Sequence, residues 1–77
     1  MAIYRLMKRY LVDSSAIKSV GYNAGSKTLE IEFRERHAIW QYHDISSYMY
    51  RRLRKAESLG NFFTTRIKGK FRESRVE

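Results

Sequence analysis

The clearest periodic pattern in the sequence is an alternation of apolar and polar residues near its centre. In the segment TLEIEFRE, Leu29, Ile31 and Phe33 alternate with polar residues, and this period of two predicts a strand with one buried face. The segment AIWQYHD continues the alternation with Trp40 and Tyr42 on one face, and its aromatic and β-branched residues favour a strand. Upstream, a third alternating segment reads SVGYN and leads into the turn-forming NAGSK. Three strands joined by short links predict an antiparallel meander.

The period changes from two to that of a helix after residue 45. Ser46 or Ser47 can cap a helix whose first amides need an acceptor. At 100° per residue, Met49, Leu53 and Ala56 fall on one narrow arc. The pattern therefore predicts an amphipathic helix with an apolar stripe along one side.

A second helix is expected directly after the first. Gly60 is a natural stop for the first helix, and Asn61 can cap the next one. Phe63, Ile67 and Phe71 then recur at every fourth position, which predicts a second apolar stripe.

These elements predict an α+β fold in which a three-stranded antiparallel β-meander is followed by two C-terminal helices packed on one face. The first twelve residues fit either a short helical stripe or an extended arm, and the pattern does not decide between them. The side chains expected to be mostly buried are Leu29, Ile31, Phe33, Trp40, Leu53, Phe63 and Ile67.

The length and composition indicate one small domain that covers residues 1–77. Seventy-seven residues are too few for two independent cores, and a single core of this size usually provides about 3–5 kcal/mol of stability. The chain has no cysteine, which excludes disulfides and thiolate metal sites. No apolar run approaches the roughly 18 residues of a membrane span, and the cations near the start interrupt any secretory signal. A cytoplasmic protein without a membrane span is expected.

The charge is strongly positive and unevenly distributed. The chain carries 16 basic and 8 acidic residues, for a net charge of +8. Residues 1–44 contribute only +2, whereas residues 45–77 contribute +6. Such asymmetry suggests a polyanion or an anionic surface as partner, although basic residues also serve solubility.

The cations of the second half form the candidate binding site. Those of the first helix lie opposite its apolar stripe, and arginine is well suited to phosphate because its planar donors match phosphate oxygens. A solvated helix face and a docking surface for an acidic protein are the alternatives. The candidate nucleic-acid-binding residues are Arg51, Arg52, Arg54, Lys55, Arg66, Lys68 and Lys70.

Several short motifs, taken together and in order, resemble the KTSC domain, a family named for its occurrence at the C-terminus of some lysyl-tRNA synthetases and also found as stand-alone proteins in bacteria and phages. The resemblance covers residues 12–71. The matching motifs are Ser14–Ser15, Val20-Gly21-Tyr22, Trp40-Gln41-Tyr42, Tyr50/Leu53/Ala56 and Ser58/Gly60/Phe62. Two positions depart from the family pattern: Trp40 stands where Tyr is usual, and Ser46 where Pro is common. The resemblance implies a domain of unknown biochemical activity, for which RNA binding is an analogy drawn from the synthetases.

No constellation of residues predicts catalysis, a metal site or a cofactor. His37 and His43 lie six residues apart, about 20 Å along a regular strand, which is too far for one metal ion. Ser14 and Ser15 have no neighbouring base or Gly-rich elbow and are expected to bond nearby backbone groups instead. The strand aromatics could stack unpaired bases if their face were open. Because they share faces with apolar residues, burial beneath the helices is the favoured interpretation.

The sequence therefore predicts a small basic binding module rather than an enzyme. The favoured function is nonspecific RNA or DNA binding through phosphate contacts, and the choice between RNA and DNA stays open. The alternatives are a module that docks on an acidic protein partner and a self-associating domain, and the sequence does not define the oligomeric state.

Overall fold

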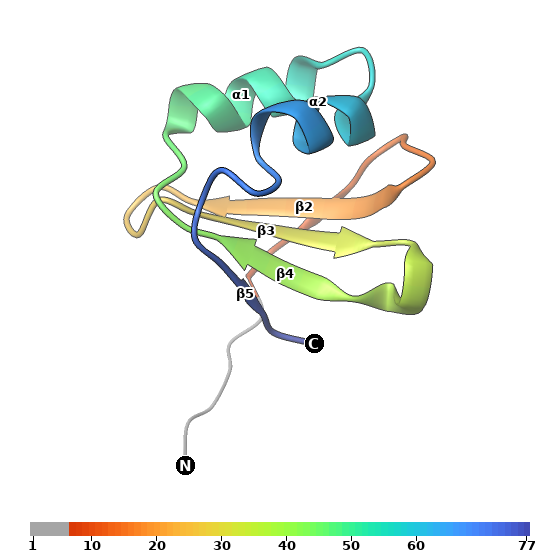
Figure 1. The fold of residues 1–77 in the computed structure, drawn as a ribbon, viewed down its shortest axis with the longest axis horizontal. Coiled ribbons are helices and arrows are strands. Elements are labelled where there is room, and N and C mark those ends of the chain that lie inside the picture. Colours follow the sequence, from red (N-terminus) through yellow and green to blue (C-terminus); the bar gives the residue numbers. More distant parts are fainter. Residues whose placement is uncertain (1–6) are drawn as a thin grey trace.

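The computed structural model describes residues 7–77, which fold as one antiparallel sheet with two helices on one side of it (Figure 1). The elements are β1 (Tyr10–Leu11), β2 (Ile17–Asn23), β3 (Thr28–Phe33), a 3-10 turn (Glu35–His37), β4 (Ile39–Tyr42), α1 (Ser47–Lys55), α2 (Leu59–Arg66) and β5 (Glu73–Arg75). The five strands follow one another in the order β1-β2-β3-β4-β5. The predicted α+β class and the central meander are confirmed.

The predicted number of strands is wrong, because the sheet has five strands and not three. The two additional strands, β1 and β5, lie at its edges and contain only two and three residues. Every residue of both strands is exposed. Segments this short and this exposed have no hydrophobic alternation by which a sequence could reveal them.

The helix boundaries also differ from those predicted. Helix α1 ends at Lys55, well before Gly60, because the backbone at Ala56 turns to an extended conformation. The cap of α2 is Ser58, whose hydroxyl accepts a hydrogen bond of 3.1 Å from the amide of Asn61. Gly60 thus lies inside α2 rather than between the helices.

The hydrophobic core lies between the helices and the inner face of β2, β3 and β4. Five of the seven residues expected in the core are buried, whereas Phe33 and Trp40 are only half-buried. The five buried residues are Leu29, Ile31, Leu53, Phe63 and Ile67. The partial exposure of Trp40 leaves part of its aromatic ring at the surface.

The opposite face of the sheet carries a buried polar network. Glu30 is completely buried and forms an ion pair with Arg9, and its other carboxylate oxygen accepts a hydrogen bond of 2.9 Å from Gln41. Arg9 also donates to Ser19 at 3.0 Å, and Ser19 donates to Glu32 at 2.9 Å. A buried carboxylate is tolerated only with such partners. The network attaches the segment before β1 to three strands of the sheet.

Gly21 provides the space for this N-terminal segment. Gly21 lies between Val20 and Tyr22, so any side chain at this position would point to the face opposite the helices. A Cβ built there would lie 2.3 Å from the carbonyl oxygen of Lys8. Tyr10 then pairs with Val20 as part of β1. The described part of the first twelve residues is therefore an extended arm; residues 1–6 lie outside the described part.

Replacing Gly21 with Ala is expected to loosen this arm. The methyl group would overlap the backbone of Lys8, which cannot move without disturbing the pairing of β1 with β2. Such overpacking typically costs about 1–3 kcal/mol. Urea unfolding should show a lower free energy of unfolding, and amide exchange should be faster at Leu11 and Val12. Gly25→Ala, in the exposed β2–β3 turn, is the control.

Candidate nucleic-acid interface

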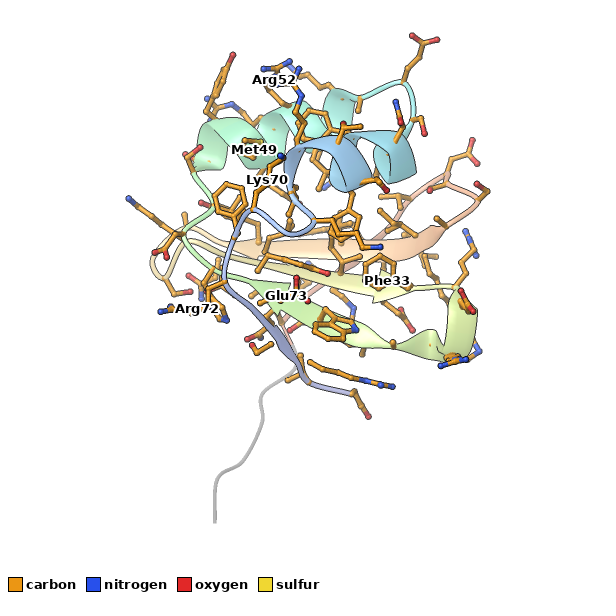
Figure 2. The ribbon with its side chains drawn as sticks, viewed as in Figure 1. Phe33, Met49, Arg52, Lys70, Arg72 and Glu73 are labelled. Atoms are coloured by element: carbon orange, nitrogen blue, oxygen red, sulfur yellow. The ribbon has the colours of Figure 1, made fainter. Side chains whose placement is uncertain are left out.

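The outer side of α1 is basic because its inner side must pack on the sheet. Ser46 starts the helix by accepting a hydrogen bond of 3.1 Å from the amide of Met49. From that start the helical period directs Leu53 into the core, where it is fully buried. The neighbouring residues Arg51 and Arg52 are exposed, and Arg52 lies on the side of the helices turned away from the sheet (Figure 2).

Cations and aromatic rings surround a hollow on this side, which we name the α1 hollow. Its volume is about 390 Å³. The residues that line it are Tyr48, Arg51, Arg52, Lys55, Ala56 and Phe62. The guanidinium carbon of Arg52 lies 5.8 Å from the ring centroids of both Tyr48 and Phe62, within the range of a cation–π contact. The α1 hollow thus combines three cations with an aromatic ring, Tyr48, that is 61% exposed.

The three cations of the α1 hollow have no carboxylate partner in the described part of the chain. Both ion pairs among residues 7–77 belong to Arg9, on the opposite face of the sheet. Arg51 and Lys55 are also i,i+4 neighbours on the helix, and such like-charge pairs cost roughly 0.2–0.5 kcal/mol. Cations in the last turn do interact favourably with the helix dipole, by about 0.3–1 kcal/mol each. The helix dipole accounts for part of this arrangement, and the remaining positive potential is available to an anion.

Arg54 is held differently from the other cations of α1. Its guanidinium donates a hydrogen bond of 2.9 Å to the hydroxyl of Tyr50 and lies 5.6 Å from the ring centroid of Tyr10. Tyr50 is in turn stacked on Tyr22 with 4.7 Å between ring centroids. Arg54 therefore links the edge strand β1 to α1, and its charge is exposed beside this contact rather than in the α1 hollow.

The remaining predicted cations do not join the α1 hollow. Arg66, Lys68 and Lys70 are all exposed, at the end of α2 and in the turn that follows it. Lys68 lines a different hollow, on the side of the sheet that carries β5. The seven predicted residues are thus exposed as expected, but the structure brings only Arg51, Arg52 and Lys55 together around one hollow.

A second hollow, which we name the sheet groove, opens where the helices do not cover the sheet. Its volume is about 780 Å³. The residues that line it are Ser15, Ala16, Phe33, Glu35, Arg36, Ala38, Trp40, Tyr42, Phe63, Lys68, Glu73 and Arg75. In the sheet, Trp40 pairs with Arg75, and Tyr42 pairs with Glu73. Strand β5 therefore forms one wall of the groove, which is why the sequence, in which β5 is not recognisable, did not reveal it.

Interlocked rings shape the inner wall of the sheet groove. Phe63 of α2 makes edge-to-face contacts with Phe33 and Tyr42, with ring centroids 5.3 Å and 5.2 Å apart. Burial, assisted by the nearby charge of Glu73, raises the pKa of the Tyr42 hydroxyl well above its ordinary value. The hydroxyl consequently keeps its proton at any physiological pH and remains a hydrogen-bond donor.

Two of the other polar residues singled out in the sequence, Ser14 and His43, form structural contacts. Ser14 accepts hydrogen bonds from the amides of Ala16 and Ile17, at 3.3 Å and 3.2 Å, which confirms that it bonds nearby backbone. His43 is 3.0 Å from the hydroxyl of Ser74 on β5. Within residues 7–77, no three His, Cys, Asp or Glu side chains lie close enough to hold a metal ion. The same part of the chain contains no helix with the length and apolar character needed to cross a membrane.

Comparisons with known proteins agree with the motif resemblance. The sequence pattern of the KTSC domain matches residues 13–71. An uncharacterized protein of Stutzerimonas stutzeri (strain A1501) is 35% identical over 57 residues, which cover 74% of this chain and 79% of that protein. The crystal structure of a KTSC domain protein from Yersinia pestis superposes with a TM-score of 0.88 at 38% sequence identity, covering 94% of this chain and 100% of that one.

Proposed function

The chain belongs to the KTSC domain family, and we propose that it is a nucleic-acid-binding module that contacts phosphates through the α1 hollow. Arg51, Arg52 and Lys55 are the phosphate contacts, and the exposed ring of Tyr48 lies beside them. Arg54 and the cations that follow α2 add to the positive potential without entering the hollow. The binding is independent of base sequence, because phosphates carry no sequence information.

The observation that carries this proposal is the grouping of three cations around one hollow without a carboxylate partner among the described residues. A helix that is only solvated has no need to place Arg51 and Lys55 next to each other at i,i+4. The contacts of Arg52 with two rings also fix the direction of its planar donors, and this lowers the entropy lost when it binds a phosphate.

Docking on an acidic protein partner is the second candidate function, since carboxylates could occupy the same hollow. Self-association is a third, because the edge strands β1 and β5 leave backbone groups open to pairing. Sedimentation at several protein concentrations measures self-association directly. Competition between labelled RNA and a polyglutamate peptide for the α1 hollow distinguishes the first two candidates. A hollow that prefers phosphate should retain the RNA when the peptide is added, whereas a hollow that prefers carboxylates should release it.

We expect titration of the protein into labelled RNA and DNA to show binding that weakens steeply with salt. If the three cations each neutralise one phosphate of a duplex, log K should fall with log salt with a slope of about −2.7, since each contact contributes roughly −0.9. Arg51→Glu should weaken binding to all sequences alike and should reduce the slope by about one contact. The double variant Arg51→Glu/Lys55→Glu should remove most of the binding without unfolding the domain, because both side chains are exposed.

Lys27→Glu is the matched control, because it changes the net charge equally at an exposed position in the β2–β3 turn. It should leave the affinity close to that of the unchanged protein. Equal losses for Lys27→Glu and Arg51→Glu would show that only net charge matters, and an absence of binding at low salt would refute the phosphate proposal altogether.

A further inference from the structure

The sheet groove has no role in the phosphate contacts of α1, yet its walls match a ligand of defined chemistry. We infer that it binds one unpaired nucleotide, with the base against Trp40 and the phosphate near Lys68 and Arg75. The nucleotide is either free or part of a single strand. In the second case the inference deepens the proposed function by adding a base-binding subsite, and the experiment below separates the two.

The position of Trp40 in the sheet leaves part of its ring open. Trp40 follows Ile31 across the sheet and is followed by Arg75. Ile31 is fully buried under the helices, Trp40 is half-buried and Arg75 is exposed. The helical layer therefore ends over β4. Trp40 packs in part against the core, but none of the ring–ring contacts within residues 7–77 involves it. The exposed part of its indole is available to stack on a base, as the aromatic platforms of single-strand-binding proteins do.

The charges around Trp40 favour an anionic ligand. Three cations, Arg36, Lys68 and Arg75, line the groove with two carboxylates, Glu35 and Glu73. None of these five groups forms an ion pair with another described residue. The ε-nitrogen of Arg75 donates to the backbone oxygen of Glu77 at 3.3 Å, and no carboxylate within residues 7–77 forms an ion pair with its guanidinium. The excess of cations and the planar donors of Arg75 suit a phosphate.

The link between β3 and β4 contributes Arg36 through an unusual backbone conformation. Arg36 and His37 both adopt left-handed conformations, with φ of 60° and 50°. Such conformations cost of order 1–3 kcal/mol each for residues other than glycine, and they are frequent at binding sites. They turn the chain so that Glu35, Arg36 and Ala38 all line the groove.

The dimensions and remaining polar groups of the groove also fit a nucleotide. Its volume of about 780 Å³ lies within the range of small-ligand sites, roughly 300–1,000 Å³. Ser15, which lines the groove, carries a hydroxyl group, and a neutral donor of this kind can pair with base or sugar oxygens. The indole ring of Trp40 beside these cations favours a nucleotide over a simple anion, because a simple anion would contact only the cations.

Trp40 provides a direct measurement, because it is the single tryptophan in the chain. We expect quenching of its fluorescence on titration with a short oligouridylate, and also with uridine monophosphate if a free nucleotide suffices. Ribose 5-phosphate, which has no base, should not quench. In parallel, fluorescence anisotropy of the labelled oligouridylate measures binding independently of Trp40. Trp40→Leu should weaken oligouridylate binding about 5- to 150-fold, the loss expected for one stacked base, whereas Trp40→Tyr should retain most of it.

The variants separate this inference from the phosphate contacts of α1. Arg51→Glu/Lys55→Glu should weaken oligouridylate binding, whereas any quenching of Trp40 by uridine monophosphate should be the same as in the unchanged protein. Arg75 is exposed and lies outside the core, so Arg75→Ala should leave the domain folded. This variant should weaken the quenching of Trp40 by the nucleotide. If no oligonucleotide binds but uridine monophosphate quenches Trp40, the phosphate proposal fails and the groove is a site for a free nucleotide. The inference is wrong if no nucleotide quenches Trp40. It is also wrong if the oligouridylate binds without changing the fluorescence of Trp40 and Arg75→Ala has no effect on that binding.

Discussion

Leu53→Ala is expected to lower the free energy of unfolding by about 2–5 kcal/mol. Leu53 is fully buried, whereas every other residue of α1 is at least partly exposed. Truncation of its side chain leaves a cavity between α1 and the sheet. Because Leu and Ala differ little in helix propensity, the lost free energy of unfolding measures the packing of this side chain. A core of this size provides only about 3–5 kcal/mol. Urea unfolding followed by circular dichroism should therefore show a domain that is largely unfolded or close to it.

Two substitutions calibrate this result. Leu53→Met nearly conserves the volume and should cost less than about 1.5 kcal/mol. Arg52→Ala, on the exposed side of α1, should lie within about 1 kcal/mol of the unchanged protein, which allows for its contacts with two rings. A Leu53→Ala variant as stable as Arg52→Ala would contradict the packing of α1 on the sheet.

Arg9→Met is expected to destabilise the domain by up to about 3–5 kcal/mol, the cost of breaking a buried ion pair from one side. Glu30 is fully buried, and the Arg9 side chain is only 15% exposed. Methionine preserves much of the apolar stem of Arg9 but removes its charge and its hydrogen bond to Ser19. The loss should appear in urea unfolding and should be accompanied by faster amide exchange in β1.

A double-mutant cycle identifies the cause of that loss. Glu30→Gln removes the buried charge, and the double variant Arg9→Met/Glu30→Gln should therefore be more stable than Arg9→Met alone. Lys8→Met changes the same net charge at the neighbouring exposed position and should have a small effect. Strict additivity of the Arg9 and Glu30 changes would show that the pair does not couple the arm to the sheet.

Much of the candidate phosphate site could be predicted from the sequence, because it depends on a single helix. The helical period alone places Leu53 opposite Arg51, Arg52 and Lys55, whatever the helix packs against. The sequence could not show that Phe62 of α2 completes the same hollow, nor that Arg54 is bound to Tyr50 and Tyr10. These contacts join elements whose relative positions follow from packing.

The sheet groove could not be predicted at all, because its walls come from four separate segments. Trp40 was expected to be buried on the argument that it shares a strand face with apolar residues. That argument assumes that the helices cover the whole face, whereas the five-stranded sheet extends beyond them. Arg54 of α1 contacts Tyr10 of β1 at one edge of the sheet, whereas every residue of β5 at the other edge is exposed.

The features that repeat with a regular period are encoded locally in the sequence: the three central strands, the amphipathic α1 and the separation of its charges from its core residue. Periodic features are local, since each position is set by its neighbours along the chain. Three features become visible only in the folded chain: the pairing of the short exposed edge strands, the need for glycine at position 21 and the partial exposure of Trp40. Backbone pairing, close approach of the arm and the extent of the helical layer each depend on segments far apart in sequence. For this reason, no local sequence pattern predicts these three features.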